Sequence, residues 1–222
     1  MIKSYIFGTS SLAKLLAYYL SEDGKKIDGF VLNESFVKDS DRYKYYLPLF
    51  TIEEVIKEYG CKNIEVFVAI GYSHMNKDRE MIFAWLRDNN IKICSYIHPS
   101  AIVAKNAILG EGNIILENCV IQPFVTIGDG NIFWNNSTIS HESLMGSYNY
   151  IAPGVTIAGR VIIKDKCFFG VNSTLRNDIL IGSDVLIAAG SYANCSLNDG
   201  TVLFPAKGTI VSDQSSLIGN LL

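Results

Sequence analysis

One periodic feature constrains this chain more than any other: an apolar residue recurs at every sixth position from residue 97 to residue 187. The sixteen members of this row are aliphatic, Met or Phe: Ile97, Val103, Leu109, Ile115, Ile121, Ile127, Phe133, Ile139, Met145, Ile151, Ile157, Ile163, Phe169, Leu175, Ile181 and Ile187. The residue four positions after each is small or Asn, except at Ile179. A repeat of this length and regularity indicates stacked repeats, because unrelated strands would drift out of register.

The six-residue period predicts a triangular coil in which each hexad forms one side and three hexads complete a turn of 18 residues. The large residue is expected to fill the interior of the prism, and the small residue or Asn to fit where the wall bends. Each coil would bury its faces against the next one. The sequence therefore predicts a parallel β-helix of about five coils, whose register fails after Tyr192 and whose exit lies at Phe204–Gly208.

The first part of the chain has a different composition and alternates strands with helices. Charged residues fill 26 of the first 95 positions but only 15 of the remaining 127. Strands are expected at 4–8, 26–32, 64–71 and 91–97, with helices at 12–20, from Thr51 onward and at 76–89. This order predicts a small parallel, Rossmann-like α/β sheet. The predicted domains are therefore an α/β domain at 1–95, a β-helix domain at 96–208 and a C-terminal tail at 209–222.

The overall composition excludes several classes of protein. The net charge of −3 argues against a nucleic-acid-binding protein, which needs a basic face. No apolar run approaches the ~18 residues of a membrane span, and the N-terminus does not read as a signal peptide. The five cysteines are odd in number and include no CxxC pair, which suits a reducing compartment. We therefore expect a soluble cytoplasmic protein with neither a nucleic-acid nor a membrane partner.

Six motifs carry a resemblance to a known family: IFGTSSLAK near the N-terminus, VAIG at a strand end, SHES in the coils, AGR one coil later, FFGVNSTLRNDILIG, and PAK at the exit. Over residues 97–208 the pattern resembles the left-handed β-helix acyltransferases. With the α/β domain before it, the chain resembles the sialic acid O-acetyltransferase and bacillosamine N-acetyltransferase family of sugar acyltransferases. The resemblance implies a left-handed β-helix and an acyl-CoA-dependent homotrimer, with active sites between adjacent β-helices, that serves surface glycan synthesis such as O-antigen or capsule.

Acyl transfer to an amine or hydroxyl needs a general base and donors for the developing oxyanion. The chain has three histidines, and only His141 lies within the regular coils. The resemblance implies that His141 is the base and that Glu142 orients it. Gly159 stands 18 residues later, so stacking predicts its N–H beside His141 as the oxyanion donor. The histidines are too scattered for a zinc site, so no metal is expected.

Several further residues are candidates for the acyl-CoA site. Asn177 lies two coils after His141 and is either a pantetheine contact or simply a corner residue. Tyr150 stands where the relatives carry a second histidine near the thioester, so acetyl-CoA is the default donor and not a deduction. Ala189 and Gly190 are small enough to let the CoA arm lie flat, and Lys207 is a candidate contact for its phosphates.

The α/β domain has three loops at strand ends where such folds bind phosphate and nucleoside. The candidate residues for the nucleotide sugar are Gly8, Thr9, Ser10, Asn33, Glu34, Gly71 and Tyr72. Because the first loop lacks the GxGxxG pattern, a nicotinamide cofactor is not expected. Asn33 departs from the acidic residues that the relatives carry.

The sequence therefore favours an acyl-CoA-dependent N- or O-acyltransferase acting on a nucleotide-linked sugar, with a 4-amino sugar as the default from the resemblance. The alternatives are a metal-dependent β-helix hydrolase or lyase and a non-catalytic protein of the same superfamily. The sugar, the nucleotide base, the acyl length and the choice between amine and hydroxyl stay open.

Overall fold

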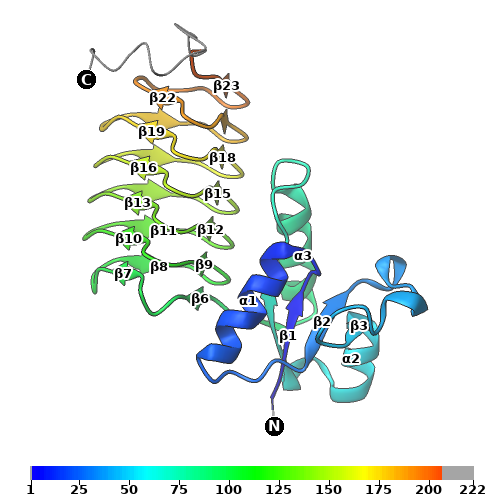
Figure 1. Cartoon of the computed structure of the whole chain (residues 1–222). Helices are drawn as coiled ribbons and strands as arrows, with labels where there is room; N and C mark the ends of the chain where they lie inside the picture. The colour runs from blue at the N-terminus through cyan, green and yellow to red at the C-terminus, as the bar shows by residue number, and fades with distance from the viewer. Residues whose placement is uncertain (1, 207–222) are drawn as a thin grey trace, which may run out of the picture.

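A computed structural model describes residues 2–206, which form an α/β part followed by a long parallel β-helix (Figure 1). The α/β part has one five-stranded sheet in the order β3-β2-β1-β4-β5, with every neighbouring pair parallel. Its strands are β1 Lys3–Phe7, β2 Gly29–Leu32, β3 Leu49–Thr51, β4 Ile64–Val68 and β5 Lys92–Ile93. Its α-helices are α1 Ser11–Glu22, α2 Ile52–Tyr59 and α3 Lys77–Asp88. Short 3-10 turns cover Glu34–Phe36, Asp39–Asp41 and Cys61–Asn63.

The strands of this sheet are buried on both faces, as their continuous apolar runs predict. Ile6 and Phe30 belong to the core that includes α1, whereas Tyr5 and Val31 belong to the core that includes α2 and α3. This alternation along each strand places helices on opposite sides of the sheet. The strand order reverses at β1, which is where open α/β sheets bind ligands.

The helix starts agree with the sequence, and α2 begins with a side-chain cap. Thr51 and Glu54 form a complete capping box, with Thr51 Oγ1 accepting from the Glu54 N–H at 3.0 Å and the Thr51 N–H donating to Glu54 Oε2 at 2.9 Å. Ser10 precedes α1 but does not cap it, because its hydroxyl donates to the carbonyl of Ala69 at 3.4 Å. The first N–H groups of α1 are therefore left without a side-chain acceptor from Ser10.

The β-helix has three flat faces, each a ladder of two-residue strands stacked in parallel. The first face contains β6 Tyr96–Ile97, β9 Ile114–Ile115, β12 Ile132–Phe133, β15 Tyr150–Ile151, β18 Phe168–Phe169, β21 Leu186–Ile187 and β23 Val202–Leu203. The second face contains β7 Ile102–Val103, β10 Val120–Ile121, β13 Thr138–Ile139, β16 Thr156–Ile157, β19 Thr174–Leu175 and β22 Tyr192–Ala193. The third face contains β8 Ile108–Leu109, β11 Thr126–Ile127, β14 Leu144–Met145, β17 Ile162–Ile163 and β20 Leu180–Ile181. This is the parallel β-helix predicted from the hexads, and it agrees with the left-handed β-helix that the resemblance implies.

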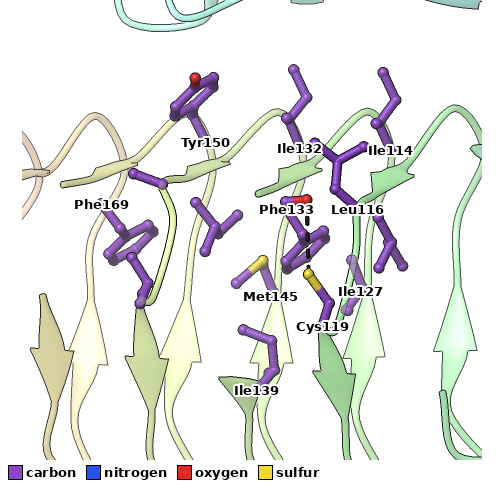
Figure 2. Close-up of a cluster of buried hydrophobic side chains, with 14 of the residues drawn as sticks. Ile114, Leu116, Cys119, Ile127, Ile132, Phe133, Ile139, Met145, Tyr150 and Phe169 are labelled. Carbon is purple, nitrogen blue, oxygen red and sulfur yellow. Dashed lines mark hydrogen bonds between the residues drawn. The ribbon is translucent and has the colours of Figure 1, made fainter. Parts of the chain in front are cut away.

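The inward row predicted from the sequence fills the prism from Ile115 onward, where every member to Ile187 is buried. Figure 2 shows Phe133, Ile139 and Met145 inside the prism, with Tyr150 on the outside of the first face. The prediction fails at the start of the row, since Ile97 is 42% exposed. The first coil has no earlier coil to cover it, so its members are only partly enclosed.

The row of small residues and Asn at the bends is also buried from Asn113 onward, and three of its members form an internal ladder. Asn113 Oδ1 accepts from the backbone and side-chain amides of Asn131, and Asn131 Oδ1 accepts in the same way from Asn149. Asn149 Oδ1 then accepts from the N–H of Cys167 at 2.8 Å. Each Asn thus satisfies buried backbone donors that the bend removes from the strand ladders.

Three sequence expectations need correction. The strand expected at 91–97 is two strands, because β5 joins the α/β sheet while β6 begins the first face of the β-helix. The short strand β3 was not expected, since it follows Pro48 and a tyrosine-rich segment without period-two alternation. The strand expected at 26–32 covers only Gly29–Leu32.

The last coil is shorter than the others. Leu197 pairs with Ile181 and Val202 with Leu186, so both steps are 16 residues instead of 18. The predicted loss of register after Tyr192 is therefore correct. The remainder of the predicted exit, and the tail at 209–222, lie outside the described residues.

Buried hydrogen bonds from α3 and its preceding loop hold the α/β part against the β-helix. Arg79 is fully buried, and its guanidinium donates to the carbonyls of Gly130, Tyr148 and Gly71 at 2.7–2.8 Å. The Asn76 side chain, also fully buried, donates to the carbonyl of Cys167 at 3.1 Å. The loop after β4 is thus held directly against the coils. Across residues 2–206, no helix is both long enough and apolar enough to cross a membrane.

Candidate active site

The bends between the second and third faces, here called the second corner, include residues 140–143, 158–161 and 176–179. His141 and Glu142 lie in the first of these bends, and their side chains are 47% and 55% exposed. His141 Nδ1 lies 3.0 Å from Glu142 Oε2. With the carboxylate accepting from Nδ1–H, Nε2 is the nitrogen free to take a proton. The backbone N–H of His141 donates to Gln122 Oε1 at 2.9 Å, which anchors the bend to the preceding coil.

Gly159 lies against the His141 ring, as the 18-residue stacking predicts. A Cβ added at Gly159 would stand 2.6 Å from both Cε1 and Nε2 of the imidazole. The glycine is required for space, since it is Arg160 next to it that has the left-handed φ of 58°. Within the described part of the chain, the Gly159 N–H donates to no protein acceptor, although its carbonyl accepts from the Asp178 N–H at 3.2 Å. A free N–H beside a basic imidazole is an arrangement that can support acyl transfer.

A charged pair flanks this group one coil further along. Arg160 donates to both carboxylate oxygens of Asp178, at 2.6 and 2.8 Å. These bonds raise the pKa of Arg160 and, together with a bond from the Asn177 amide, lower the pKa of Asp178. Asn177 lies at the second corner with His141 and Gly159, as the 18-residue spacing predicts. Its amide, however, donates a hydrogen bond to the Asp178 carboxylate.

Other residues predicted for the acyl-CoA site lie apart from His141 in the single chain. Tyr150 is on the first face and is only 8% exposed. Ala189 and Gly190 lie in the bend between the first and second faces. Lys207 lies outside the described residues. The structure thus brings together His141, Glu142, Gly159 and Asn177, and it separates Tyr150, Ala189 and Gly190 from them.

A cavity of about 510 Å³ opens at the carboxyl ends of β1, β2 and β4. Five residues predicted for the nucleotide sugar line it: Gly8, Thr9, Ser10, Asn33 and Gly71. Asn33 Oδ1 is buried and has no hydrogen-bond partner among the described residues. A buried acceptor without a donor is costly, so this oxygen suits a ligand that brings one.

Two predicted residues miss this cavity. Glu34 lines a smaller one of about 330 Å³ together with Arg42 and Glu54. Tyr72 packs its ring edge-to-face on Tyr150 and Phe168, with centroids 5.0 Å away in both pairs. The aromatic group of Tyr72, Tyr150 and Phe168 joins the loop after β4 to the first face.

The larger cavity is also lined by residues that no sequence motif had indicated, among them Phe36, Asp78, Met81 and Ile82. The α3 residues resemble ordinary positions of an amphipathic helix, and Phe36 belongs to a turn that carries no motif. The α3 residues reach the cavity only because that helix approaches the carboxyl ends of β1 and β4. His74 was visible as one of three histidines, but its partner Asp78 was not singled out. Within residues 2–206, no three His, Cys, Asp or Glu side chains gather closely enough to hold a metal ion.

Comparisons with known proteins agree with this architecture. Residues 106–141 match the family model described as bacterial transferase hexapeptide (six repeats). The fold is similar to the acetyltransferase domain of PglB from Neisseria gonorrhoeae FA1090, with a TM-score of 0.78 and 22% identity over 91% of this chain and 96% of that one. It is also similar to PerB from Caulobacter crescentus, solved with CoA and GDP-perosamine, with a TM-score of 0.79 and 24% identity over 90% and 92%. WeeI from Acinetobacter baumannii AYE gives a TM-score of 0.60 and 14% identity over 91% and 96%.

These likenesses cover both parts of the chain together. The resemblance stated from the sequence is therefore confirmed for the fold: an α/β part followed by a left-handed β-helix that contains hexapeptide repeats.

Proposed function

We propose that this chain is an acyl-CoA-dependent acyltransferase, with acetyl-CoA as the default donor and a nucleotide-linked sugar as the acceptor. The observation that carries the proposal is the group of His141, Glu142 and Gly159, where a supported imidazole lies against a glycine whose N–H is free. The similar structures support the same interpretation, because PerB was solved with CoA and GDP-perosamine and the PglB domain with acetyl coenzyme A.

The proposed reaction uses one base for two proton transfers. Nε2 of His141 takes the proton from the acceptor amine or hydroxyl as that group attacks the thioester carbonyl. Glu142 stabilises the resulting imidazolium through Nδ1, and the Gly159 N–H donates to the oxyanion. When the carbon–sulfur bond breaks, the proton on His141 passes to the departing CoA sulfur. The product is the acylated sugar nucleotide with free CoA thiol.

The cavity in the α/β part supports a nucleotide-linked acceptor. It lies where the strand order reverses and where the uncapped start of α1 offers N–H groups to phosphate. Its volume of about 510 Å³ is within the range for small-molecule sites. We propose that Gly8, Thr9 and Ser10 contact the diphosphate and that Asn33 contacts the nucleoside. A 4-amino sugar remains the default, and such a product would serve O-antigen or capsule synthesis in the cytoplasm.

We further propose a homotrimer whose neighbouring chain completes the active site. The third face, which adjoins the second corner, presents an outward row in which Ile108, Leu144, Ile162 and Leu180 are 39–65% exposed, and Thr126 is its one polar member. A row of this kind is suited to burial against another chain. A second chain would also supply a wall for the pantetheine arm beside Asn177. We propose that the adjoining β-helix contributes the remaining candidates to the acyl-CoA site: Tyr150, Ala189, Gly190 and Lys207. Arg176 is available for a CoA phosphate, because it forms no salt bridge among the described residues.

The proposal is tested by a thiol-release assay with acetyl-CoA and a panel of UDP-, dTDP- and GDP-linked amino sugars. At least one acceptor should release free CoA thiol at a rate that saturates, and mass spectrometry should find the acceptor heavier by one acetyl group. The free sugar without its nucleotide should react far more slowly. Binding of acetyl-CoA without thiol release on any acceptor would favour a non-catalytic protein.

A further inference from the structure

We propose that His74, held by Asp78, binds the diphosphate of the nucleotide sugar in the cavity of the α/β part. This inference rests on the proposed function and adds a residue to it. Both side chains line the cavity together with Thr9 and Ser10 at the start of α1. Among the described residues that line the cavity, they are the only ones with ionisable side chains, and none is Lys or Arg. A diphosphate in this cavity would therefore meet one side chain that is able to carry a positive charge, that of His74.

The contact with Asp78 fixes which nitrogen of His74 faces a ligand. Nδ1 lies 3.0 Å from each oxygen of the Asp78 carboxylate, so this nitrogen carries a proton and donates it to Asp78. Nε2 has no hydrogen-bond partner within residues 2–206. With Nδ1–H given to Asp78, Nε2 donates to a phosphate oxygen only when the ring is the imidazolium. Phosphate binding and protonation of His74 are therefore coupled.

The backbone around His74 is held in an unusual conformation. His74, Met75 and Asn76 are three consecutive non-glycine residues with left-handed φ values of 49°, 52° and 64°. Such residues are uncommon, and runs of them persist only when their surroundings impose them. Here the surroundings are Arg79 and the coils, since the Asn76 side chain accepts from Arg79 and donates to the Cys167 carbonyl.

The same anchors connect this segment to the cavity wall. Arg79 also donates to the carbonyls of Ile70 and Gly71, which line the cavity. Hydrogen bonds thus hold both ends of the segment from Ile70 to Arg79. The backbone of His74 is therefore fixed in place, although its side chain is 80% exposed. Strain of this kind is often found where a side chain must be presented to a ligand.

Calorimetry with nucleoside diphosphates tests the inference on the full chain. The probes are UDP, dTDP and GDP together with their nucleosides uridine, thymidine and guanosine. The variant is His74→Asn, because Asn tolerates a left-handed backbone better than most residues. His98→Asn is the matched control, since His98 is a partly exposed histidine that does not line the cavity. Asp78→Asn tests the support of the ring.

The expected result separates phosphate from nucleoside. His74→Asn should weaken binding of the nucleoside diphosphate that the wild type prefers by about tenfold to a hundredfold, the value of a hydrogen bond to a charged group. Binding of the matching nucleoside and of acetyl-CoA should stay within about twofold, and His98→Asn should change neither. Near pH 8, where ordinary histidine is mostly neutral, binding to the wild type should take up a proton, detected as a dependence of enthalpy on the buffer. This uptake should vanish in His74→Asn and fall in Asp78→Asn.

Two outcomes would overturn the inference. Unchanged diphosphate affinity in His74→Asn would show that the ring makes no contact, and equal losses for diphosphate and nucleoside would indicate a change of cavity shape instead. Binding of none of the three diphosphates by the wild type is a distinct result, which would also remove the nucleotide-linked acceptor from the proposed function.

Discussion

Replacement of Gly159 by Ala is the most specific perturbation of the proposed active site. The added methyl carbon would lie 2.6 Å from Cε1 and Nε2 of His141, whereas ordinary contacts begin at about 3.4 Å. Because the ring is half-exposed, it can rotate away toward solvent. Nε2 would then move by about 1 Å, a displacement that typically lowers turnover by about a hundredfold.

The same change should leave the fold intact. Gly159 does not use a left-handed φ, and the side chain that must move is on the surface. The free energy of unfolding should therefore change by less than about 1 kcal/mol. The Gly159→Ala variant also keeps the backbone N–H at this position, so any loss of activity reports on the position of His141 and not on a missing oxyanion donor.

A double-mutant cycle tests whether the methyl group at position 159 acts through the His141 ring. The value of kcat/KM for thiol release would be measured in the wild type, Gly159→Ala, His141→Ala and the double variant. Because the methyl group acts through the ring, Gly159→Ala should lower kcat/KM about a hundredfold in the wild type and by less than about threefold once the ring is gone. Equal losses in both backgrounds, or near-normal turnover in Gly159→Ala, would refute this account of the glycine.

Three further predictions concern the support of the base, the bends and acid stability. Glu142→Gln should lower kcat about tenfold to a hundredfold with little change in either KM, because the imidazolium of His141 loses its charged partner. Steady-state kinetics with both substrates checks this prediction, and a rise in KM alone would contradict it. Asn131→Ala should reduce the free energy of unfolding by about 2–4 kcal/mol in urea titrations, because the Asn149 N–H loses its buried acceptor; a loss below about 0.5 kcal/mol would argue against the ladder. Burial alone would raise the pKa of Glu65, but hydrogen bonds from Lys25, Lys92 and Ser4 outweigh it and hold that pKa at about 2, below the ordinary 4.5. The resulting stabilisation of about 3 kcal/mol is complete above pH 4.5 and is lost as the pH falls toward 2, so Glu65→Gln should flatten the stability profile in that range in acid-denaturation experiments.

The β-helix was predictable because its geometry is periodic. A constant coil of 18 residues turns sequence spacing into spatial contact, so Gly159 could be placed beside His141 by counting. The contact between Glu142 and His141 could be predicted more simply, because the two residues are adjacent in the sequence. The periodic row predicted the wrong burial only at its start, as at Ile97, where no earlier coil continues the stack. The loss of register after Tyr192 correctly indicated where the coil shortens.

Contacts between the two parts of the chain follow no period, and sequence reasoning missed them. Arg79 resembles a polar helix residue, yet it is fully buried because carbonyls of both parts surround its guanidinium. Tyr72 was assigned to the nucleotide from its loop position, but its ring packs on Tyr150 from the first face. The cavity wall that Asp78 of α3 and His74 of the preceding loop contribute depends on how that helix lies across the sheet.

The proposed role of His141 as the base for acyl transfer is tested by kcat/KM for acetyl-CoA-dependent thiol release in His141→Ala against the wild type. The measurement uses the sugar nucleotide that the wild type turns over fastest, with acetyl-CoA affinity and thermal unfolding as controls. If His141 is the base, kcat/KM should fall by a factor of about 10²–10⁴ in His141→Ala, with unchanged thermal unfolding and acetyl-CoA affinity. Turnover in His141→Ala equal to that of the wild type would contradict this role.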